Sequence, residues 1–251
     1  MASRCLLAAL AVWFWAAPAR AGECTTAVVK GSPDLGAIDA QVRLRFLRER
    51  LGHEARRARI WSWSWAGVYT GLTAVQLGVT PAMGRDARKD MYVGAGASFL
   101  GLAIIGVMPL RVMGDQRWLE RRLRTAPPGT HECVLLAEAE GLLLRDAKNE
   151  AFGVSQIVHV GNVIVNLAVF LTIGAGFGHW FSGAISFAAG VAVGEVMIYT
   201  QPLGAVEDLE RYRAGELRPA PPARRVGLGV APFVPAGTRG GPRGAALALT
   251  F

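Results

Sequence analysis

Six polar residues inside long, mainly apolar stretches of the chain have the side chains that are best placed for chemistry. They are Gln76, Gln156, His159, Asn162, Asn166 and Glu195. A carboxylate beside an imidazole can pass a proton near neutral pH, because the pKa of histidine lies close to that range. Amides only donate and accept hydrogen bonds. The set therefore fits either a proton or ion pathway or a group of hydrogen bonds that hold helices together.

The apolar stretches that carry these residues are long enough to cross a membrane. They cover residues 60–82, 91–110, 153–175 and 181–200. About 20 helical residues span the ~30 Å hydrocarbon layer, so we predict an all-α integral membrane protein with four transmembrane helices. The links at 83–90 and 176–183 are too short to hold a domain. Each link must join antiparallel neighbours, which gives one hairpin over 60–110 and a second over 153–200.

The polar residues of the third apolar stretch share one helix face. Gln156, His159, Asn162 and Asn166 recur at three- and four-residue spacing, which forms a stripe. Glu195 lies at a similar depth to His159 on the next, antiparallel helix, so the two side chains can meet. Polar groups that face lipid are costly, and we expect the stripe to face the bundle interior or a wet cavity. We favour structural hydrogen bonding over a transport site, because such bonds are common in membrane bundles.

Small residues spaced four apart predict places where two helices approach closely. The three spacings are Gly67–Gly71, Ala97–Gly101 and Gly190–Gly194. Motifs of this kind are frequent in membrane helices of every function. They therefore indicate packing and do not identify an activity.

The N-terminal region predicts export and one disulfide. Residues 1–21 are typical of a signal peptide, with Arg4, an apolar core and a small-residue cleavage site before Gly22. Cleavage removes Cys5 and leaves Cys24 and Cys133. Two thiols in an exported chain favour a disulfide, and two unpaired thiols are the alternative.

The two hairpins place the longer segments together on one side of the membrane. These segments are 22–59, 111–152 and 201–251. They hold 22 Lys and Arg residues, against 3 in the short links, so the positive-inside rule would place them in the cytoplasm. A cleaved signal peptide places them outside instead. We follow the signal peptide and expect a bacterial cell membrane protein, inner rather than outer, with these segments and the C-terminus extracytoplasmic.

The segments outside the membrane predict a small cap. Within 22–59, apolar residues recur at helical spacing between many arginines. This helix fits either the surface of anionic lipid headgroups or packing against a second helix at 132–152. The two apolar stripes are Leu44, Leu47, Leu51, Ala55, Ala58 in the first helix and Cys133, Leu136, Leu143, Ala147, Ala151 in the second. The Pro-, Gly- and Arg-rich tail, 201–251, predicts either a short β-hairpin or a disordered end.

No catalytic signature occurs in the chain. His131-Glu132 lacks the second histidine of a metalloprotease helix, and no Cys/His spacing resembles a zinc site. The net charge of +8, beside membrane helices, favours anionic lipid over nucleic acid as a partner. We therefore expect a non-enzymatic scaffold or assembly subunit without cofactor or metal, which binds another copy or other membrane proteins. A small transporter or ion pathway that uses Glu195 is the alternative.

Overall fold

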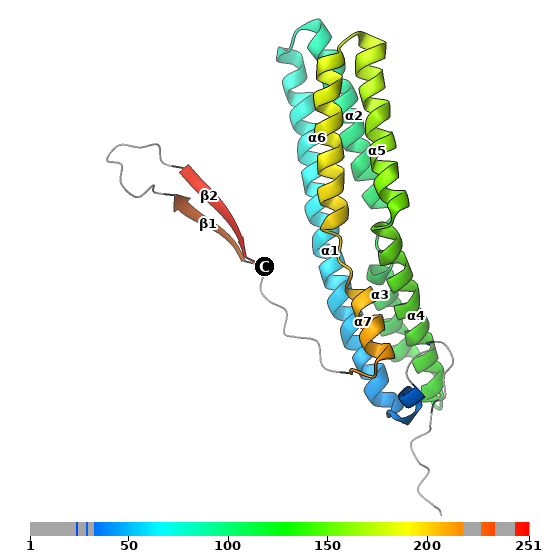
Figure 1. The fold of residues 1–251 in the computed structure, drawn as a ribbon. Coiled ribbons are helices and arrows are strands. Elements are labelled where there is room, and N and C mark those ends of the chain that lie inside the picture. Colours follow the sequence, from blue (N-terminus) through cyan, green and yellow to red (C-terminus); the bar gives the residue numbers. More distant parts are fainter. Residues whose placement is uncertain (1–23, 25–28, 30–32, 218–226, 234–243, 251) are drawn as a thin grey trace, which may run out of the picture.

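A computed structural model describes residues 24, 29, 33–217, 227–233 and 244–250. Its main body is a long bundle of four antiparallel rods (Figure 1). A 3₁₀ turn, η1 (Pro33–Ala37), precedes the first rod, α1 (Ala40–Val79), which ends in η2 (Thr80–Ala82). The other rods are α2 (Arg85–Val107) with α3 (Val112–Thr125), α4 (Glu132–Gly153) with α5 (Gln156–Leu171) and the π-helical turn η3 (Thr172–Gly176), and α6 (Trp180–Tyr199) with α7 (Gly204–Arg213).

The first rod is one continuous helix. Asp39 caps its start by accepting hydrogen bonds from the backbone N–H groups of Gln41 and Val42, at 2.9 and 3.1 Å. The helix continues through residue 60 and ends where Pro81 removes a backbone donor. The basic segment therefore runs in line with the apolar half of α1. It does not turn to lie flat on the headgroups, which was one of the two arrangements expected.

The other three rods each break near the middle of the bundle (Figure 1). Pro109 lies between α2 and α3, and Pro202 lies between α6 and α7, as expected for a residue that cannot continue a helix. The third break follows Gly153, and Ser155 stands at the N-cap of α5. These breaks divide the bundle into an apolar half (residues 60–107 and 156–199) and a cap (residues 33–59, 111–153 and 204–217).

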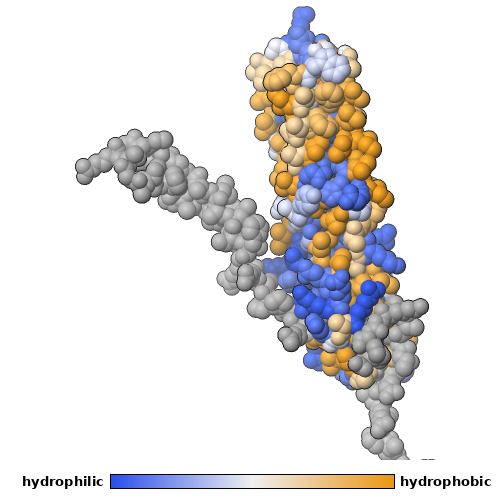
Figure 2. Space-filling view, viewed as in Figure 1, coloured by the Kyte–Doolittle hydropathy of each residue, from blue (hydrophilic) through white to orange (hydrophobic). Residues whose placement is uncertain are grey.

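Three helices of the apolar half are long and apolar enough to cross a membrane. They lie in the stretches 85–125, 156–176 and 180–213. Figure 2 shows the corresponding half of the surface as mainly hydrophobic and the cap as mixed. The predicted span at 60–82 is not among the three, because its Trp, Ser, Thr and Gln residues lower its mean hydropathy. The links are also shorter than predicted, since α2 already begins at Arg85 and α6 at Trp180.

The cap has a hydrophobic core built from the first half of α1 with α3, α4 and α7. Leu47 and Leu51 of α1 are buried in the same core as Leu136 and Leu143 of α4. Both predicted stripes therefore contribute to this core, apart from Ala151, which is exposed. The structure has the packed cap rather than separate surface helices.

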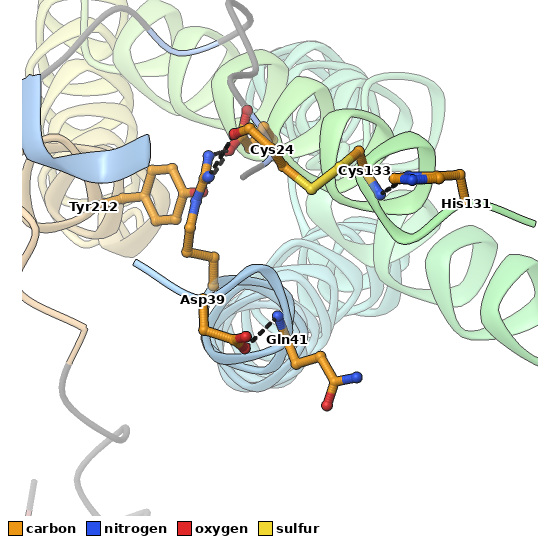
Figure 3. The surroundings of a disulfide bond; sticks show 8 residues. Cys24, Asp39, Gln41, His131, Cys133 and Tyr212 are labelled. Carbon is orange, nitrogen blue, oxygen red and sulfur yellow. Dashed lines mark hydrogen bonds and ion pairs between the residues drawn. A yellow bond between two sulfur atoms is a disulfide. The ribbon is translucent and has the colours of Figure 1, made fainter. Parts of the chain in front are cut away.

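A disulfide joins Cys24 to Cys133 at the start of α4, as predicted (Figure 3). The Cα atoms of the two residues lie 5.3 Å apart. The bond ties the segment before α1 to the cap. The predicted signal peptide, 1–21, lies outside the described residues.

Two short strands are present in the tail. β1 (Gly227–Phe233) pairs antiparallel with β2 (Gly244–Thr250), so that Gly227 lies opposite Thr250. The sequence predicted either a short β-hairpin or a disordered end for the tail, and the described strands form a β-hairpin.

Candidate intramembrane polar site

His159 and Glu195 meet between α5 and α6. The imidazole Nδ1 lies 2.6 Å from the Glu195 carboxylate Oε2, and Asn162 Nδ2 donates to Oε1 of the same carboxylate at 3.0 Å. The predicted contact between His159 and Glu195 is therefore present, and Asn162 is a second partner of the same carboxylate. The centre of the Tyr199 ring lies 5.4 Å from the centre of the His159 ring, and the two rings are tilted against each other.

Three of these residues, His159, Glu195 and Tyr199, line a groove on the outside of the bundle. The groove has a volume of about 410 Å³, with Gln156, His159, Glu195 and Tyr199 at its polar end and Val163 and Ile164 among its apolar residues. Figure 2 shows a hydrophilic patch that interrupts the hydrophobic surface over α5 and α6. The sequence predicted that the stripe faces the bundle interior or a wet cavity, and at this end it faces the groove rather than the interior. The reason is that α5 packs mainly against α6 and much less against α2 and α4.

The two asparagines of the stripe do face a neighbouring helix. Asn162 Nδ2 donates to the backbone carbonyl of Val191 at 3.1 Å, and Asn166 Nδ2 donates to Asn162 Oδ1 at 2.9 Å. Their side chains lie against Gly194 and Gly190 on α6, where a Cβ atom would overlap the amide oxygens. The small-residue spacing on α6 therefore makes room for the two amides of α5.

Replacing Gly194 by alanine is expected to weaken the α5–α6 contact. The added Cβ would collide with Asn162 Oδ1, and overpacking of this kind costs about 1–3 kcal/mol. The measurement is the apparent Tm of the detergent-solubilised chain, followed by helical circular dichroism. Gly161→Ala is the matched control, because a Cβ at Gly161 of α5 meets no neighbouring atom. An equal loss of stability in both variants would contradict the close contact between Asn162 and Gly194. Adding Asn162→Ala to Gly194→Ala should restore the stability, because it removes the side chain that the new Cβ would meet.

Gln76 belongs to a different contact from the other five predicted residues. Ser98 of α2 donates its hydroxyl hydrogen to Gln76 Oε1 at 3.1 Å, and a Cβ at Gly94 would lie 2.8 Å from Gln76 Nε2. Gln76 therefore joins α1 to α2.

A second contact between α1 and α2 places the ring of Tyr69 against Gly101. This glycine ends the Ala97–Gly101 spacing, so the close approach predicted there is confirmed. By contrast, a Cβ atom added at Gly67 or at Gly71 would meet no neighbouring atom within 4 Å. Within the described residues, the close approach predicted at Gly67–Gly71 is therefore absent, because no helix packs against these two glycines.

A second histidine–carboxylate pair lies at the opposite end of the apolar half. His179 Nδ1 is 2.8 Å from Asp90 Oδ1, and Lys89 lies over the ring of Phe177 at 5.8 Å. This pair joins the start of α2 to the link before α6. The sequence interpretation missed it because both residues were placed in the short links. The signal that could have found it is that both links lie on the same side of the bundle.

The arrangement can transfer a proton between His159 and Glu195, and it can hold α5 against α6. Among the described residues, no group of three or more His, Cys, Asp or Glu side chains is placed to hold a metal ion. Ser98 and Asp90 are polar groups nearer the opposite end of the apolar half. They contact Gln76 and His179, and so they are separate from the Asn162–Asn166 pair. Comparisons with protein-family models, with curated proteins and with solved structures find no match for this chain.

Proposed function

We propose that the protein is a non-enzymatic membrane scaffold or assembly subunit. The observation that carries the proposal is the seating of Asn162 and Asn166 on the glycines of α6. The side-chain amides of these two residues form hydrogen bonds with each other, with Glu195 and with a backbone carbonyl, all within the bundle. Polar side chains used in this way hold helices together and leave little capacity for a passing solute.

The proposed membrane arrangement has four spans in two antiparallel hairpins. In it, the second half of α1 crosses the membrane beside α2. Two observations support this placement: α1 contacts α2 more extensively than it contacts any other helix, and several of its outward side chains are large and apolar. These are Val68, Leu72, Val75, Leu77 and Val79.

We propose that the cap lies outside the cytoplasm of a bacterial cell, on the inner membrane. The disulfide between Cys24 and Cys133 supports this side, since such bonds persist in oxidising compartments. Several arginines of the cap also connect its helices to one another. Arg48, Arg122 and Arg145 form ion pairs with acidic residues of other cap helices.

A proton or ion pathway is the second candidate, and the open groove beside His159 and Glu195 favours it. Two substitutions separate the candidates: Glu195→Gln, which removes the charge and keeps the shape, and His159→Ala. For a scaffold, we expect reconstituted vesicles with the unaltered chain to show no more proton flux than empty vesicles. Both variants should lower the apparent Tm of the bundle, and native electrophoresis of solubilised membranes should show less of the assembled complex.

The same experiment identifies the pathway if that candidate is correct. The unaltered chain would then carry proton flux, and Glu195→Gln would abolish the flux while the helical content and the assembly stay intact. Asp86→Asn is the matched control, because its carboxylate is exposed at the far end of α2, where it pairs with Lys89. Flux that depends on Glu195 but not on Asp86 would overturn the scaffold proposal.

A further inference from the structure

A second hollow lies in the cap, between the start of α3 and the second half of α4. Its volume is about 480 Å³, and Arg111, Arg145 and Lys148 line it. Asn149, Gly141 and Leu144 complete the lining, which contains no acidic residue. Three basic side chains around one hollow indicate an anion as the ligand.

The charges around this hollow do not cancel. Arg145 pairs with Asp115, since its Nη2 lies 2.7 Å from Oδ1 of that carboxylate. Arg111 and Lys148 are exposed and form no ion pair within the part of the chain that the structure describes. Asn149 Oδ1 accepts a hydrogen bond from the backbone N–H of Arg111 at 3.1 Å, so the NH₂ end of its amide is left to donate. The hollow thus offers two uncompensated positive charges and a neutral donor.

The hollow lies at the boundary between the cap and the apolar half. Arg111 lies in the break between α2 and α3, just before α3 begins at Val112. At 1.5 Å per helical residue, Lys148 is about 8 Å before the end of α4. On the membrane side of these residues, Val107, Met108 and Phe152 are large, apolar and exposed. A ligand that binds the basic residues therefore has a hydrophobic surface beside it.

We infer that this hollow binds the phosphate of an anionic phospholipid, with the acyl chains lying along Val107 and Phe152. Arg111, Lys148 and the Asn149 amide supply the hydrogen-bond donors, and a guanidinium can hold two phosphate oxygens at once. Free inorganic phosphate has the same head chemistry but no chains for the apolar surface. The inference rests on the proposed membrane placement of α2 and α5, and it does not depend on the scaffold role.

The test uses the full chain in a non-ionic detergent and measures bound lipid by mass spectrometry of the intact complex. The probes are dioctanoyl phosphatidylglycerol, dioctanoyl phosphatidylcholine and inorganic phosphate. The variant is Arg111→Gln with Lys148→Gln. We expect phosphatidylglycerol to bind the unaltered chain most tightly, and the variant to bind it about 30-fold more weakly, as expected for two lost basic contacts.

The matched control is Arg121→Gln with Arg213→Gln, which removes two charges from exposed positions of the cap outside the hollow. It should bind phosphatidylglycerol like the unaltered chain. Equal loss in the control, or equal binding of the two lipids by the unaltered chain, overturns the inference. Inorganic phosphate that binds as tightly as phosphatidylglycerol overturns the lipid assignment.

A variant with a single change keeps the inference testable if the double variant does not fold. The exposed Lys148→Gln alone gives the same comparison, with a smaller loss. Assembly on native electrophoresis should stay intact in all these variants, which separates this result from failure of the scaffold proposal.

Discussion

Replacing Glu140 by glutamine is expected to destabilise the cap by about 3–5 kcal/mol, the usual cost of removing one partner from a buried ion pair. Glu140 of α4 is fully shielded from solvent, and Arg43 of α1 is 2% exposed. The substitution keeps the shape of the side chain but removes its charge. The buried Arg43 guanidinium would then lose the negative charge of Glu140 beside it.

The geometry around Arg43 explains why the loss should be large. Its Nε donates to the Tyr212 hydroxyl of α7 at 2.8 Å, and Nη1 donates to the backbone carbonyl of Cys24 at 3.0 Å. Nη2 and the Tyr212 hydroxyl both donate to Glu140 Oε1. Figure 3 shows Tyr212 close to the Cys24–Cys133 disulfide. The network of Arg43, Glu140 and Tyr212 therefore connects α1, α4, α7 and the segment before α1.

The measurement is the apparent Tm of the detergent-solubilised chain, which should fall by about 10 °C for a loss of this size. Glu120→Gln is the matched control, because Glu120 pairs with Arg48 at 2.7 Å but the Arg48 side chain is 55% exposed. Exposed pairs contribute about 0–1 kcal/mol. A similar fall in both variants would contradict the buried network. The combined variant Arg43→Met, Glu140→Leu and Tyr212→Phe should recover much of the loss, since apolar groups of similar volume can replace a buried ion pair.

This network also shows where sequence interpretation reached its limit in the cap. The apolar stripes predicted the core correctly, because Leu47 and Leu136 recur at helical spacing with their neighbours. Arg43 and Arg50 are two of the many arginines that lie between the apolar residues of this helix, yet both are buried. Their acidic partners, such as Asp208, lie far along the chain. Local spacing cannot show that a charge will be buried opposite a distant partner.

For the polar site in the apolar half too, one part could be predicted from the sequence and another could not. The contact of His159 with Glu195 could be predicted, because depth along two antiparallel helices follows from the positions of their ends. The direction in which the groove opens could not, since it depends on which helices cover α5. Likewise, the spacing of Gly190 and Gly194 predicted close packing, but the asparagine side chains that fill the space became visible only in three dimensions.

Three buried carboxyl groups of the cap give a second large effect, a dependence of stability on pH. Burial, strengthened by the neighbouring Asp115, raises the pKa of Asp146 to about 9. Burial also raises the pKa of Glu150 to about 7, although the backbone N–H of Ala205 donates to its Oε2 at 2.8 Å. The pKa of Asp208 rises to about 6, again mainly through burial. Unfolding returns all three pKa values to about 4.

The sign of the effect follows from these shifts. Between about pH 4 and each raised pKa, the folded cap holds a proton that the unfolded chain releases, so folding becomes less favourable as the pH rises. The opposite contribution comes from Glu120, whose pKa is lowered by its hydrogen bond from Arg48, and it is lost only at a pH below about 4. Between pH 5 and 8, the raised groups should therefore dominate.

We expect the apparent Tm of the cap to rise when the pH is lowered from 8 to 5. A group that lies wholly within its titration window changes the stability by about 1.4 kcal/mol per pH unit, so the three groups together change it by on the order of 5–10 kcal/mol between pH 8 and pH 5. Asp146→Asn tests whether Asp146 causes this pH dependence, because the amide has the shape of the neutral acid and cannot ionise inside the cap. This variant should be more stable than the unaltered chain at pH 8 and should depend less on pH. A Tm that stays constant or falls on acidification would show that these carboxyl groups are ionised in the folded cap.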